Sequence, residues 1–382
     1  MEKRVAITGA GIAGLSAAIA LKNIGIEAVV FESAPVLKPL GAGLALAANA
    51  VKAFDYLGIA KEVVRNGKVL PSFTIYDQQG KVITKNESLQ LNEKYGTSNL
   101  TIHRADLHKV LLSKLDKSSI QLNKKAVDYV KNGDEVSIRF QDGTSYETDY
   151  LIVADGIHSP LRKKLLPDSL PRFAGYTCWR AIIENVEPGV VEASETWGTD
   201  GRFGIVPLAN NKIYWFACLN STQDNEVYKN YTIEDLRLHF KDFHGSIPAI
   251  LKKTRNENLI WNDIIDIKPI HQYAFDNILF IGDAAHATTP NMGQGASQAI
   301  EDAAFLLSEI KKTSDFTVAF KRFEERRLER THYITNTSWK IGRAAQIENK
   351  VLAAIRNMVF RLIPDGLNER QFKLLYNVSF DN

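Results

Sequence analysis

The chain has little cysteine and no long hydrophobic run, and each shortage excludes a class of protein. Its only cysteines, Cys178 and Cys218, are too few for a disulfide framework and are not spaced as metal ligands. Both lie in strand-like segments, so we expect buried thiols in a reducing compartment. No apolar stretch reaches the roughly 18–20 residues that a membrane-spanning helix requires. We therefore expect no disulfide, no metal site and no membrane span.

A surplus of charge of one sign is also missing. The 382 residues contain 47 Lys and Arg against 44 Asp and Glu, which gives a net charge of +3, and no basic block stands out. This balance does not indicate a nucleic-acid partner. The composition is that of a globular protein with room for two to three domain-sized units. The first residues enter a predicted strand rather than a signal peptide, which predicts a cytoplasmic protein.

What the sequence does contain is a glycine-rich motif directly after its first predicted strand. Residues 4–8 form the strand, Gly9, Gly11 and Gly14 follow, and a helix is predicted over residues 12–23. Gly9 permits a tight turn, Gly11 lets the backbone approach a pyrophosphate, and Gly14 allows the helix to pack closely on the strand.

An acidic residue ends the next predicted strand. Residues 28–31 form a short apolar strand that ends in Glu32, eighteen residues after Gly14. A carboxylate at this place can bind both hydroxyls of a ribose and disfavours a 2′-phosphate. Strand, glycines, helix and acid together predict a dinucleotide site. The motif alone does not choose between NAD and the AMP half of FAD.

Two later strands also end in turns that contain an acid. The strand over residues 150–154 is followed by Asp155, and the strand over residues 278–281 leads to Asp283. A glycine-rich segment then enters a predicted helix over residues 296–310, whose first N–H groups suit an anionic ligand. A single such match is explained equally well by a plain turn. The two turns together fit an open sheet whose strand ends line one crevice.

Two intervening stretches have the alternating pattern of strands. Residues 171–269 predict an antiparallel sheet that forms a substrate module, with a helix over residues 234–243 on one face. Residues 72–84 predict a hairpin outside the nucleotide fold, and residues 120–148 predict a meander. The predicted strands of the module span residues 176–183, 190–197, 203–208 and 213–218.

The C-terminal part is predicted to be helical. One helix is expected over residues 316–343, and apolar residues then recur at helical spacing. We expect them to pack against the two domains, and a basic amphipathic membrane helix is the alternative. The recurring residues are Val351, Leu352, Ile355, Met358, Val359 and Leu362.

In this order, the motifs resemble those of the single-component FAD-dependent aromatic hydroxylases, the class of the p-hydroxybenzoate and salicylate hydroxylases. Residues 9–14 with Glu32 resemble the AMP-binding motif, residues 154–162 the DG motif, and residues 282–286 the GD motif. Residues 289–295 resemble the segment beside the isoalloxazine. The resemblance covers nearly the whole chain and is closest to the branch of urate hydroxylase, 3-hydroxybenzoate 6-hydroxylase and zeaxanthin epoxidase.

The resemblance implies an α/β fold with a Rossmann-like (GR2-type) FAD-binding domain, an antiparallel β-sheet substrate domain and a C-terminal helical tail. The implied boundaries are 1–70, 100–170 and 270–330 for the FAD-binding domain, 71–99 and 171–269 for the substrate domain, and 331–382 for the C-terminal helices. The implied FAD contacts are Gly9, Gly11, Ala13, Gly14, Glu32, Ala45, Arg104, Ala126, Asp155, Asp283, Pro290, Gly293, Gly295 and Ala296.

The resemblance also implies a reaction. NADH or NADPH would reduce FAD, O₂ would add to form a flavin C4a-hydroperoxide, and a small aromatic or N-heteroaromatic substrate would be hydroxylated. The alternatives are an epoxidase of a larger apolar substrate and a flavin-binding redox protein without oxygen transfer. A monomer or homodimer without a membrane contact is expected. The substrate and the choice between NADH and NADPH are left open.

Arg202, Tyr214 and Arg180 are the predicted substrate-site residues. Arg202 and Tyr214 match an Arg and a Tyr that serve the substrate in the urate enzyme, and an Arg can hold an anionic substrate oxygen. A Tyr could orient or deprotonate the substrate. The competing interpretations are a surface cation for Arg202 and a core aromatic residue for Tyr214. Asn291, where Asp is expected in the urate enzyme, argues against urate itself.

His286 directly follows the GD motif. Its imidazole could act as a base, but its position favours a structural contact instead.

Overall fold

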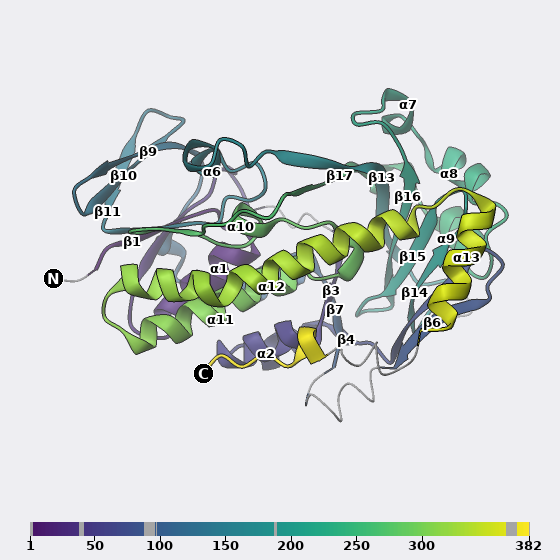
Figure 1. Cartoon of the computed structure of the whole chain (residues 1–382), viewed down its shortest axis with the longest axis horizontal. Coiled ribbons are helices and arrows are strands. Elements are labelled where there is room, and N and C mark those ends of the chain that lie inside the picture. The colour runs from purple at the N-terminus through teal and green to yellow at the C-terminus, as the bar shows by residue number, and fades with distance from the viewer. Residues whose placement is uncertain are drawn as a thin grey trace.

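The computed structural model describes residues 3–37, 42–87, 96, 98–186, 189–363 and 373–381. Two β-rich regions lie side by side, and a single long helix, α12 (Phe316–Ala345), crosses one face of both (Figure 1). One region carries the glycine-rich motif, and the other contains the predicted substrate module.

The first region is built on a six-stranded sheet with the order β18-β19-β12-β1-β2-β8. All neighbours pair in parallel except β18, which pairs antiparallel with β19 at the edge. Apolar residues fill both faces of the central strands, as expected for parallel strands that are covered on both sides. The strands are β1 (Val5–Thr8), β2 (Ala28–Phe31), β8 (Ile120–Gln121), β12 (Tyr150–Val153), β18 (Ala274–Phe275) and β19 (Ile278–Phe280).

Helices pack around this sheet, and α1 is the most deeply buried of them. Residues Ile12 to Leu21 of α1 are all buried, because its small side chains let it fit between the sheet and α11. The predicted helices in this part of the chain are confirmed within a few residues. The helices are α1 (Ile12–Lys22), α2 (Ala48–Tyr56), α3 (Ala60–Asn66), α5 (Arg104–Leu112), α6 (Pro160–Leu165), α10 (Asp283–His286) and α11 (Gly295–Lys312), with short 3-10 turns η1 (Lys117–Ser119) and η3 (Pro290–Met292).

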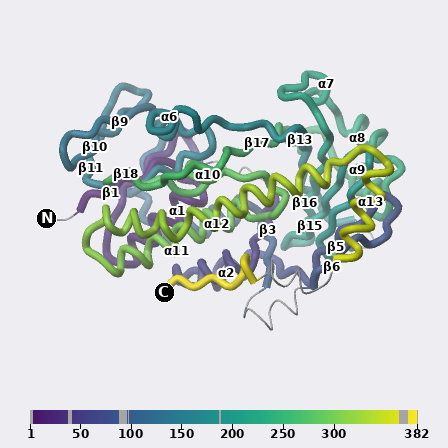
Figure 2. The backbone as a smooth tube through the Cα atoms, in the orientation of Figure 1, coloured from purple at the N-terminus to yellow at the C-terminus, as the bar shows by residue number. Residues whose placement is uncertain are grey.

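Two three-stranded antiparallel sheets flank the six-stranded sheet. One has the order β11-β10-β9 and contains β9 (Ala126–Asn132), β10 (Glu135–Phe140) and β11 (Ser145–Thr148). The other has the order β3-β7-β4 and contains β3 (Gly43–Leu46), β4 (Lys68–Val69) and β7 (Leu100–His103). Figure 2 shows the β3 segment between the six-stranded and seven-stranded sheets.

The predicted meander over residues 120–148 is only partly correct. Residues 120–130 are not one strand, because Asn123 adopts a left-handed φ of 57° and breaks the run. The part before the break, β8, joins the parallel sheet, whereas β9 after it begins the meander.

The second region is a seven-stranded sheet with the order β17-β13-β16-β15-β14-β5-β6. The predicted antiparallel sheet and the hairpin over residues 72–84 are both present, and the two join through a parallel pair between β14 and β5. The strand predicted over 190–197 begins only at Ala193. The strands are β5 (Ser72–Asp77), β6 (Val82–Glu87), β13 (Pro171–Glu184), β14 (Ala193–Trp197), β15 (Arg202–Pro207), β16 (Lys212–Asn220) and β17 (Ile260–Ile267).

One face of this sheet is covered by short helices and an aromatic core. The rings of Phe203 and Trp215 stack with centroids 5.2 Å apart, and Phe240 meets the first of them edge-on. The predicted covering helix is present as α8, which is shorter than the predicted 234–243. The helices are α7 (Glu226–Lys229), α8 (Ile233–His239) and α9 (Ile247–Lys253), with the 3-10 turn η2 (Asn256–Asn258).

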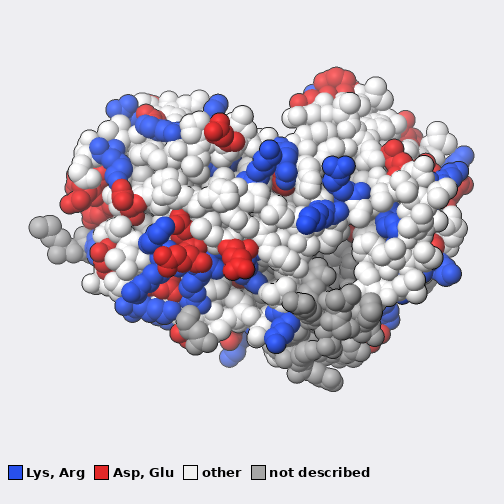
Figure 3. All heavy atoms as spheres, in the orientation of Figure 1, with Lys and Arg blue, Asp and Glu red and all other residues white. Residues whose placement is uncertain are grey.

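The prediction that the apolar residues after α12 pack against the two domains is wrong, as the C-terminal helix α13 (Lys350–Arg361) shows. It docks on the seven-stranded sheet through Ala353 and Arg356, and the Arg356 guanidinium bonds the carbonyls of Ala344 and Ala345 at the end of α12. The recurring apolar residues therefore point away from the protein, and each is between 48% and 71% exposed. Figure 3 shows an uncharged strip of surface at this end of the molecule, bordered by charged side chains.

No helix among the described residues has the length and apolar character to cross a bilayer.

Candidate active site

The three motif turns meet at one edge of the six-stranded sheet. Thr8, the last residue of β1, pairs with Val153, the last residue of β12, and Val153 pairs with Phe280, the last residue of β19. The glycine motif, Asp155 and Asp283 therefore leave the sheet from adjacent, aligned strand ends. This confirms that the three motif turns share the carboxyl edge of one sheet, and the ligand crevice at that edge stays a prediction.

Each glycine of the first motif has its own steric environment. Gly9 has a φ of +97°, and a Cβ on it would overlap the carbonyl oxygen of Ala154. A Cβ on Gly14 would overlap the carbonyl oxygen of Gly9. By contrast, a Cβ on Gly11 would have no heavy atom within 4 Å. Gly9 and Gly14 are thus required by the fold, whereas the backbone at Gly11 is open to a ligand.

The Glu32 carboxylate braces the same turn. It accepts hydrogen bonds from the N–H of Ala10 and the N–H of Ala34, both at 2.8 Å. Oε1 also accepts from the Ser33 hydroxyl at 3.0 Å, but Oε2 accepts only from Ala10 among the described residues, so Glu32 can still accept a ribose hydroxyl there. Ala126, another predicted contact, lies outside this sheet on β9, two residues beyond Lys124, whose N–H bonds the Glu32 carbonyl.

Asp155 carries a carboxylate without a well-formed hydrogen bond. Both of its side-chain oxygens are shielded from solvent and have no partner that meets hydrogen-bond geometry. Burial raises the pKa of this carboxyl to about 6, and the Ser159 hydroxyl and the Arg162 charge offset only part of that effect. An orphaned acceptor next to Gly9 is suited to a ligand hydroxyl.

Asp283 is exposed although the residues on both sides of it are buried. The surrounding protein reduces the solvation of its carboxyl and so raises its pKa, whereas the nearby positive charges of Arg104 and Arg162 lower that pKa. Arg104, which begins α5, is itself exposed, so the structure brings this predicted contact to the Asp283 end of the crevice. An exposed carboxylate among buried neighbours can accept hydrogen bonds from a polyol chain.

Arg162 ties the second motif to the third. Its guanidinium is almost fully buried and donates to the carbonyl oxygens of Gly156 and Ile157, next to Asp155. The same group reaches the carbonyl of Ala284, next to Asp283, at 3.1 Å. Arg162 therefore fixes the spacing of the two acidic turns rather than binding a ligand itself.

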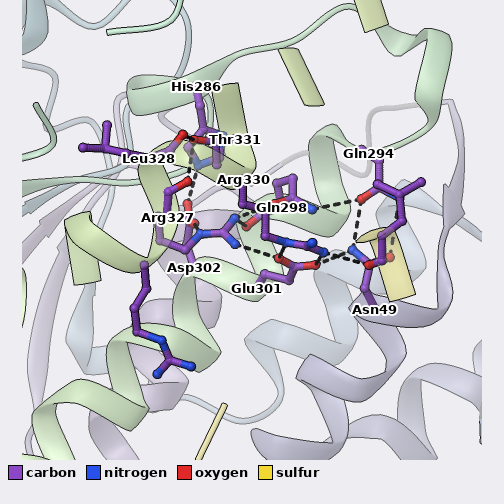
Figure 4. A network of polar contacts seen from close by, with 12 residues as sticks. Asn49, His286, Gln294, Gln298, Glu301, Asp302, Arg327, Leu328, Arg330 and Thr331 are labelled. Atoms are coloured by element: carbon purple, nitrogen blue, oxygen red, sulfur yellow. Dashed lines mark hydrogen bonds and ion pairs between the residues drawn. The ribbon is translucent and has the colours of Figure 1, made fainter. Parts of the chain in front are cut away.

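A buried ion network anchors the third motif from behind (Figure 4). Asp302 of α11 accepts from the Gly282 N–H and from His286 Nε2, both at 2.7 Å, and from Arg327 Nε at 2.7 Å. The expected structural contact of His286 is therefore present. Arg327 of α12 also pairs with Glu301 at 2.7 Å. The network locks the turn before Asp283 to two helices.

The segment after the GD motif faces the open side of the crevice. Pro290 and Gly293 are exposed, and Gly293 adopts a left-handed φ of +62°. A Cβ on Gly293 would lie 4.0 Å from the Cβ of exposed Ala45, so β3 and η3 meet here. Gly295 and Ala296 then begin α11, where backbone N–H groups lack helical partners. A Cβ on Gly282 would lie 2.6 Å from the Cβ of Ala13, another predicted contact.

The seven-stranded sheet supplies the opposite wall of the site. Tyr176, Cys178 and Arg180 alternate along β13 and therefore share one face of the sheet. Cys178 pairs with Cys218 of β16, and Cys218 pairs in turn with Arg202 of β15. The predicted Arg180 and Arg202 thus lie on the same face of the sheet, on β13 and β15, with β16 between them.

Arg202 is buried and held by two side chains. Its Nη1 bonds Glu195 at 3.0 Å, and its Nη2 bonds Asn291 Oδ1 at 2.6 Å. Its Nε has no partner among the described residues, although it is shielded from solvent. The alternative of a surface cation is therefore wrong. A buried N–H without an acceptor costs roughly 1–3 kcal/mol, which a bound acceptor would recover.

Tyr214 lies where the two regions touch. A Cβ on Gly43 of β3 would come within 2.6 Å of the Tyr214 Cβ, so the glycine allows this close approach. Burial raises the pKa of the Tyr214 hydroxyl far above its usual value, and the charge of Arg180 offsets only part of that rise. Tyr214 is therefore suited to donate a hydrogen bond to a substrate and unsuited to act as a base.

Two residues that link the walls were not predicted as site residues. Asn291 Oδ1 accepts from the Tyr176 hydroxyl at 3.0 Å as well as from Arg202, and Asn291 Nδ2 donates to the Ser338 carbonyl at 2.9 Å. Asn291 thus joins the segment after the GD motif to the sheet and to α12. The alternation of Tyr176 with Arg180 on one strand was the available signal, whereas the contact with Asn291 is not visible in the sequence.

The chain matches known proteins over most of its length. Residues 2–315 match the family described as FAD binding domain. An aurachin C monooxygenase/isomerase of Stigmatella aurantiaca is 33% identical over 361 residues, which cover 94% of each chain. A 2-heptyl-3-hydroxy-4(1H)-quinolone synthase of Pseudomonas aeruginosa is 31% identical over 378 residues, which cover 97% of each chain.

A solved structure agrees over nearly the full length. A Klebsiella pneumoniae protein crystallised with FAD and uric acid aligns with a TM-score of 0.89 at 27% identity, covering 98% of this chain and 97% of that one.

Proposed function

This chain belongs to the FAD binding domain family, and on that premise we propose that it hydroxylates an N-heteroaromatic ring with NADH or NADPH and O₂. Membership of the family confirms the predicted fold class, the FAD cofactor and the enzyme class of FAD-dependent monooxygenases. The ring class that we favour is a 4-quinolone with an apolar tail. It is supported by the name of the Pseudomonas relative, and the Stigmatella relative is likewise named as a monooxygenase.

The residues of the crevice fit FAD. Gly11 leaves room for a pyrophosphate, and Glu32 and Asp283 keep free acceptor capacity for ribose and ribityl hydroxyls. The orphaned Asp155 carboxylate offers a further acceptor. Bound FAD supplies electron transfer from the nicotinamide and activation of O₂. The start of α11 would lie beside its ring, as the resemblance implies for residues 290–296.

The buried, partly unpaired guanidinium of Arg202 is the observation that carries the proposal. Its free Nε–H can donate to the ring oxygen of the substrate, and its fixed charge favours the electron-rich, enolate-like form of that ring. The Tyr214 hydroxyl remains protonated and can donate to a second polar atom. The Phe216 ring lies over Gly204, where a Cβ would overlap it, and gives the wall an apolar surface.

Asn291 supports a substrate other than urate. Both of its N–H groups donate, to Thr289 Oγ1 at 2.8 Å and to the Ser338 carbonyl at 2.9 Å. The Asp that the resemblance leads us to expect in the urate enzyme could not make these two bonds. The contacts at this position therefore require the side-chain amide of Asn291.

The proposal is tested with isotopic oxygen and a panel of ring compounds. Holoenzyme is incubated with NADH or NADPH under ¹⁸O₂ and with 2-alkyl-4-quinolones of increasing tail length, urate, 6-hydroxynicotinate or salicylate. We expect a quinolone to stimulate NAD(P)H oxidation and to gain one ¹⁸O atom. Oxidation of NAD(P)H without labelled product from any ring would instead favour a redox protein without oxygen transfer.

A second candidate function is favoured by α13. A larger apolar substrate, epoxidised while dissolved in lipid, would require access to a lipid surface. The exposed apolar face of α13 has no acidic residue, and the helix begins at the exposed Lys350, a composition that suits a lipid interface.

The second candidate is tested with vesicles of phosphatidylcholine and phosphatidylglycerol. We expect the protein to sediment with them, and an Ile355→Glu, Met358→Glu double variant to stay in solution. Leu238→Glu on α8 is the matched control, because Leu238 is also an exposed apolar residue, at 70%. Equal sedimentation of all three proteins would remove the support for this candidate.

A further inference from the structure

The two cysteines of the chain lie directly opposite each other in the wall of the site. Cys178 of β13 and Cys218 of β16 are partners in the antiparallel register, and both are buried and unbridged. Side chains at paired positions point to the same face of a sheet. That face also carries Tyr176 and Arg202, which bond Asn291 in the segment after the GD motif.

Two guanidinium groups lie beside this pair. Arg180 Nε bonds Cys178 Sγ at 3.4 Å, and Arg202 is the register partner of Cys218. Burial by itself would raise the pKa of Cys178, but the hydrogen bond from the Cys218 thiol and the charge of Arg180 lower it below its usual value. The pKa of Cys218 is raised, first by burial. Cys178, which Arg180 bonds, is thus the more acidic thiol and Cys218 the less acidic one, which is the arrangement of a reactive and a resolving cysteine.

We propose that Cys178 and Cys218 form a peroxide-reactive dithiol in the substrate wall, which closes to a disulfide when hydrogen peroxide is released at the flavin. The source of the peroxide rests on the proposed function, because a monooxygenase without a suitable substrate passes its electrons to O₂. Both thiols are buried from bulk solvent and lie on the face of the sheet that also carries Tyr176 and Arg202. On the proposed function, the oxidant would arise on this same side of the sheet, where Tyr176 and Arg202 bond Asn291.

The chemistry balances with hydrogen peroxide as the only oxidant. The Cys178 thiolate attacks one peroxide oxygen, the O–O bond breaks, and hydroxide leaves, so that the sulfur becomes a sulfenic acid. Cys218 then attacks this sulfur. The S–S bond forms, the S–O bond breaks, and the oxygen leaves as water with the thiol proton. The proton that Cys178 releases on forming its thiolate converts the hydroxide to water, so the dithiol loses two electrons and two protons in total, and one peroxide becomes two waters.

The backbone geometry permits this bridge. Directly opposite residues of an antiparallel pair have Cα atoms roughly 4.5–5.5 Å apart. Disulfides span roughly 4.4–6.8 Å between Cα atoms. The bridge would remove the ionisable thiol that Arg180 bonds, so Arg180 would lose this partner, whereas Arg202 would keep its ion pair with Glu195. We expect oxidation to change the affinity for substrate and to be reversed by a thiol reductant.

The test uses FAD-loaded enzyme in two arms. In the first arm, reagent hydrogen peroxide is added without NAD(P)H. In the second arm, NAD(P)H and air are supplied without an aromatic substrate, with and without catalase. We expect a mass loss of about 2 Da and the disappearance of both thiols after unfolding, each reversed by dithiothreitol. Any thiol loss can be assigned, because the chain has only these two cysteines.

Two variants identify the roles of the cysteines. Cys218→Ser should accumulate a sulfenic acid at Cys178 that dimedone traps, whereas Cys178→Ser should keep its remaining thiol under the same conditions. If wild type keeps both thiols, or is oxidised only to sulfinic and sulfonic acids, the proposed dithiol is wrong. If reagent peroxide closes the bridge but turnover does not, the dithiol stands and the proposed oxygen chemistry is what fails.

Discussion

Two buried polar regions of this protein differ in how completely their groups are paired. Between α11 and α12, the ionised oxygens of Glu301 and Asp302 are matched by Arg327, Arg330 and the partners around them (Figure 4). On the wall of the site, Arg202 retains an N–H without an acceptor, and across the crevice Asp155 retains two oxygens without donors. In these two regions, complete pairing coincides with contacts that hold helices together, and incomplete pairing coincides with groups that could bind a ligand.

We expect the largest effect when an ion pair between α11 and α12 is removed. Arg327→Leu leaves Glu301 and Asp302 buried with one cation fewer, and we expect it to lower the free energy of unfolding by about 3–5 kcal/mol. Arg322→Leu on the exposed side of the same helix should change it by less than about 0.5 kcal/mol. Urea unfolding of both variants measures the difference. A similar small change in both would mean that the network does not support the fold.

The matching change in the incompletely paired region should affect activity more than stability. Arg202→Ala is combined with Glu195→Gln, because the Arg202→Ala substitution alone would leave the buried Glu195 carboxylate unpaired. We expect kcat/KM to fall by about 100-fold, which corresponds to roughly 2.7 kcal/mol, with FAD still bound. Glu195→Gln alone is the control, and its kcat/KM should fall less. Loss of FAD from the double variant would place Arg202 in the cofactor site instead.

A smaller effect is expected at two glycines of the first motif, of which Gly14 is required by packing and Gly11 is open to a ligand. Gly14→Ala forces a Cβ onto the Gly9 carbonyl, and we expect it to lower the free energy of unfolding of the FAD-free protein by about 1–3 kcal/mol. Gly11→Ala meets open space and should leave that free energy unchanged while weakening FAD binding. Urea unfolding without FAD and fluorescence titration with FAD separate the two effects. Tight FAD binding by Gly11→Ala would contradict the proposed pyrophosphate site.

The smallest expected effect concerns the orphaned carboxylate of Asp155. Its folded pKa of about 6 lies above the ordinary value of 3.8, so ionisation destabilises the FAD-free protein. This penalty is absent below about pH 4, grows as the pH rises to about 6, and remains constant above that. Asp155→Asn should therefore raise the free energy of unfolding by about 1–2 kcal/mol at pH 8 and leave it unchanged at pH 4. Equal gains at both pH values would mean that charge is not the cause.

The sequence was sufficient for the features that depend on short stretches of chain. Each of the three motif turns follows its strand directly, so strand, glycine and acid could be predicted together, and the pairing of Thr8, Val153 and Phe280 confirms their common edge. The chain order of the motifs supplied the family. The FAD contacts themselves remain predictions, although the structure brings most of them to that edge.

What could not be predicted depends on contacts between distant segments. Helical spacing marked residues 351–362 as an apolar stripe but did not reveal that Arg356, on the opposite side, makes the docking contacts. The role of Asn291 depends on Arg202 and Tyr176, which are separated from it by 89 and 115 residues. Register between β13 and β16 likewise determines that the two cysteines meet. None of these pairings has a local signal.

The strand order of the central sheet has a consequence for synthesis. The first strand, β1, ends at Thr8, and β19, which completes the crevice, begins at Ile278. At roughly 5–20 residues per second, a ribosome would need about 15–55 s to produce the intervening residues. During that time the glycine motif exists without the turn that carries Asp283, and the apolar edge of β12 has no partner. FAD can therefore bind its complete site only late in translation, and the growing chain must keep a parallel sheet unfinished until then.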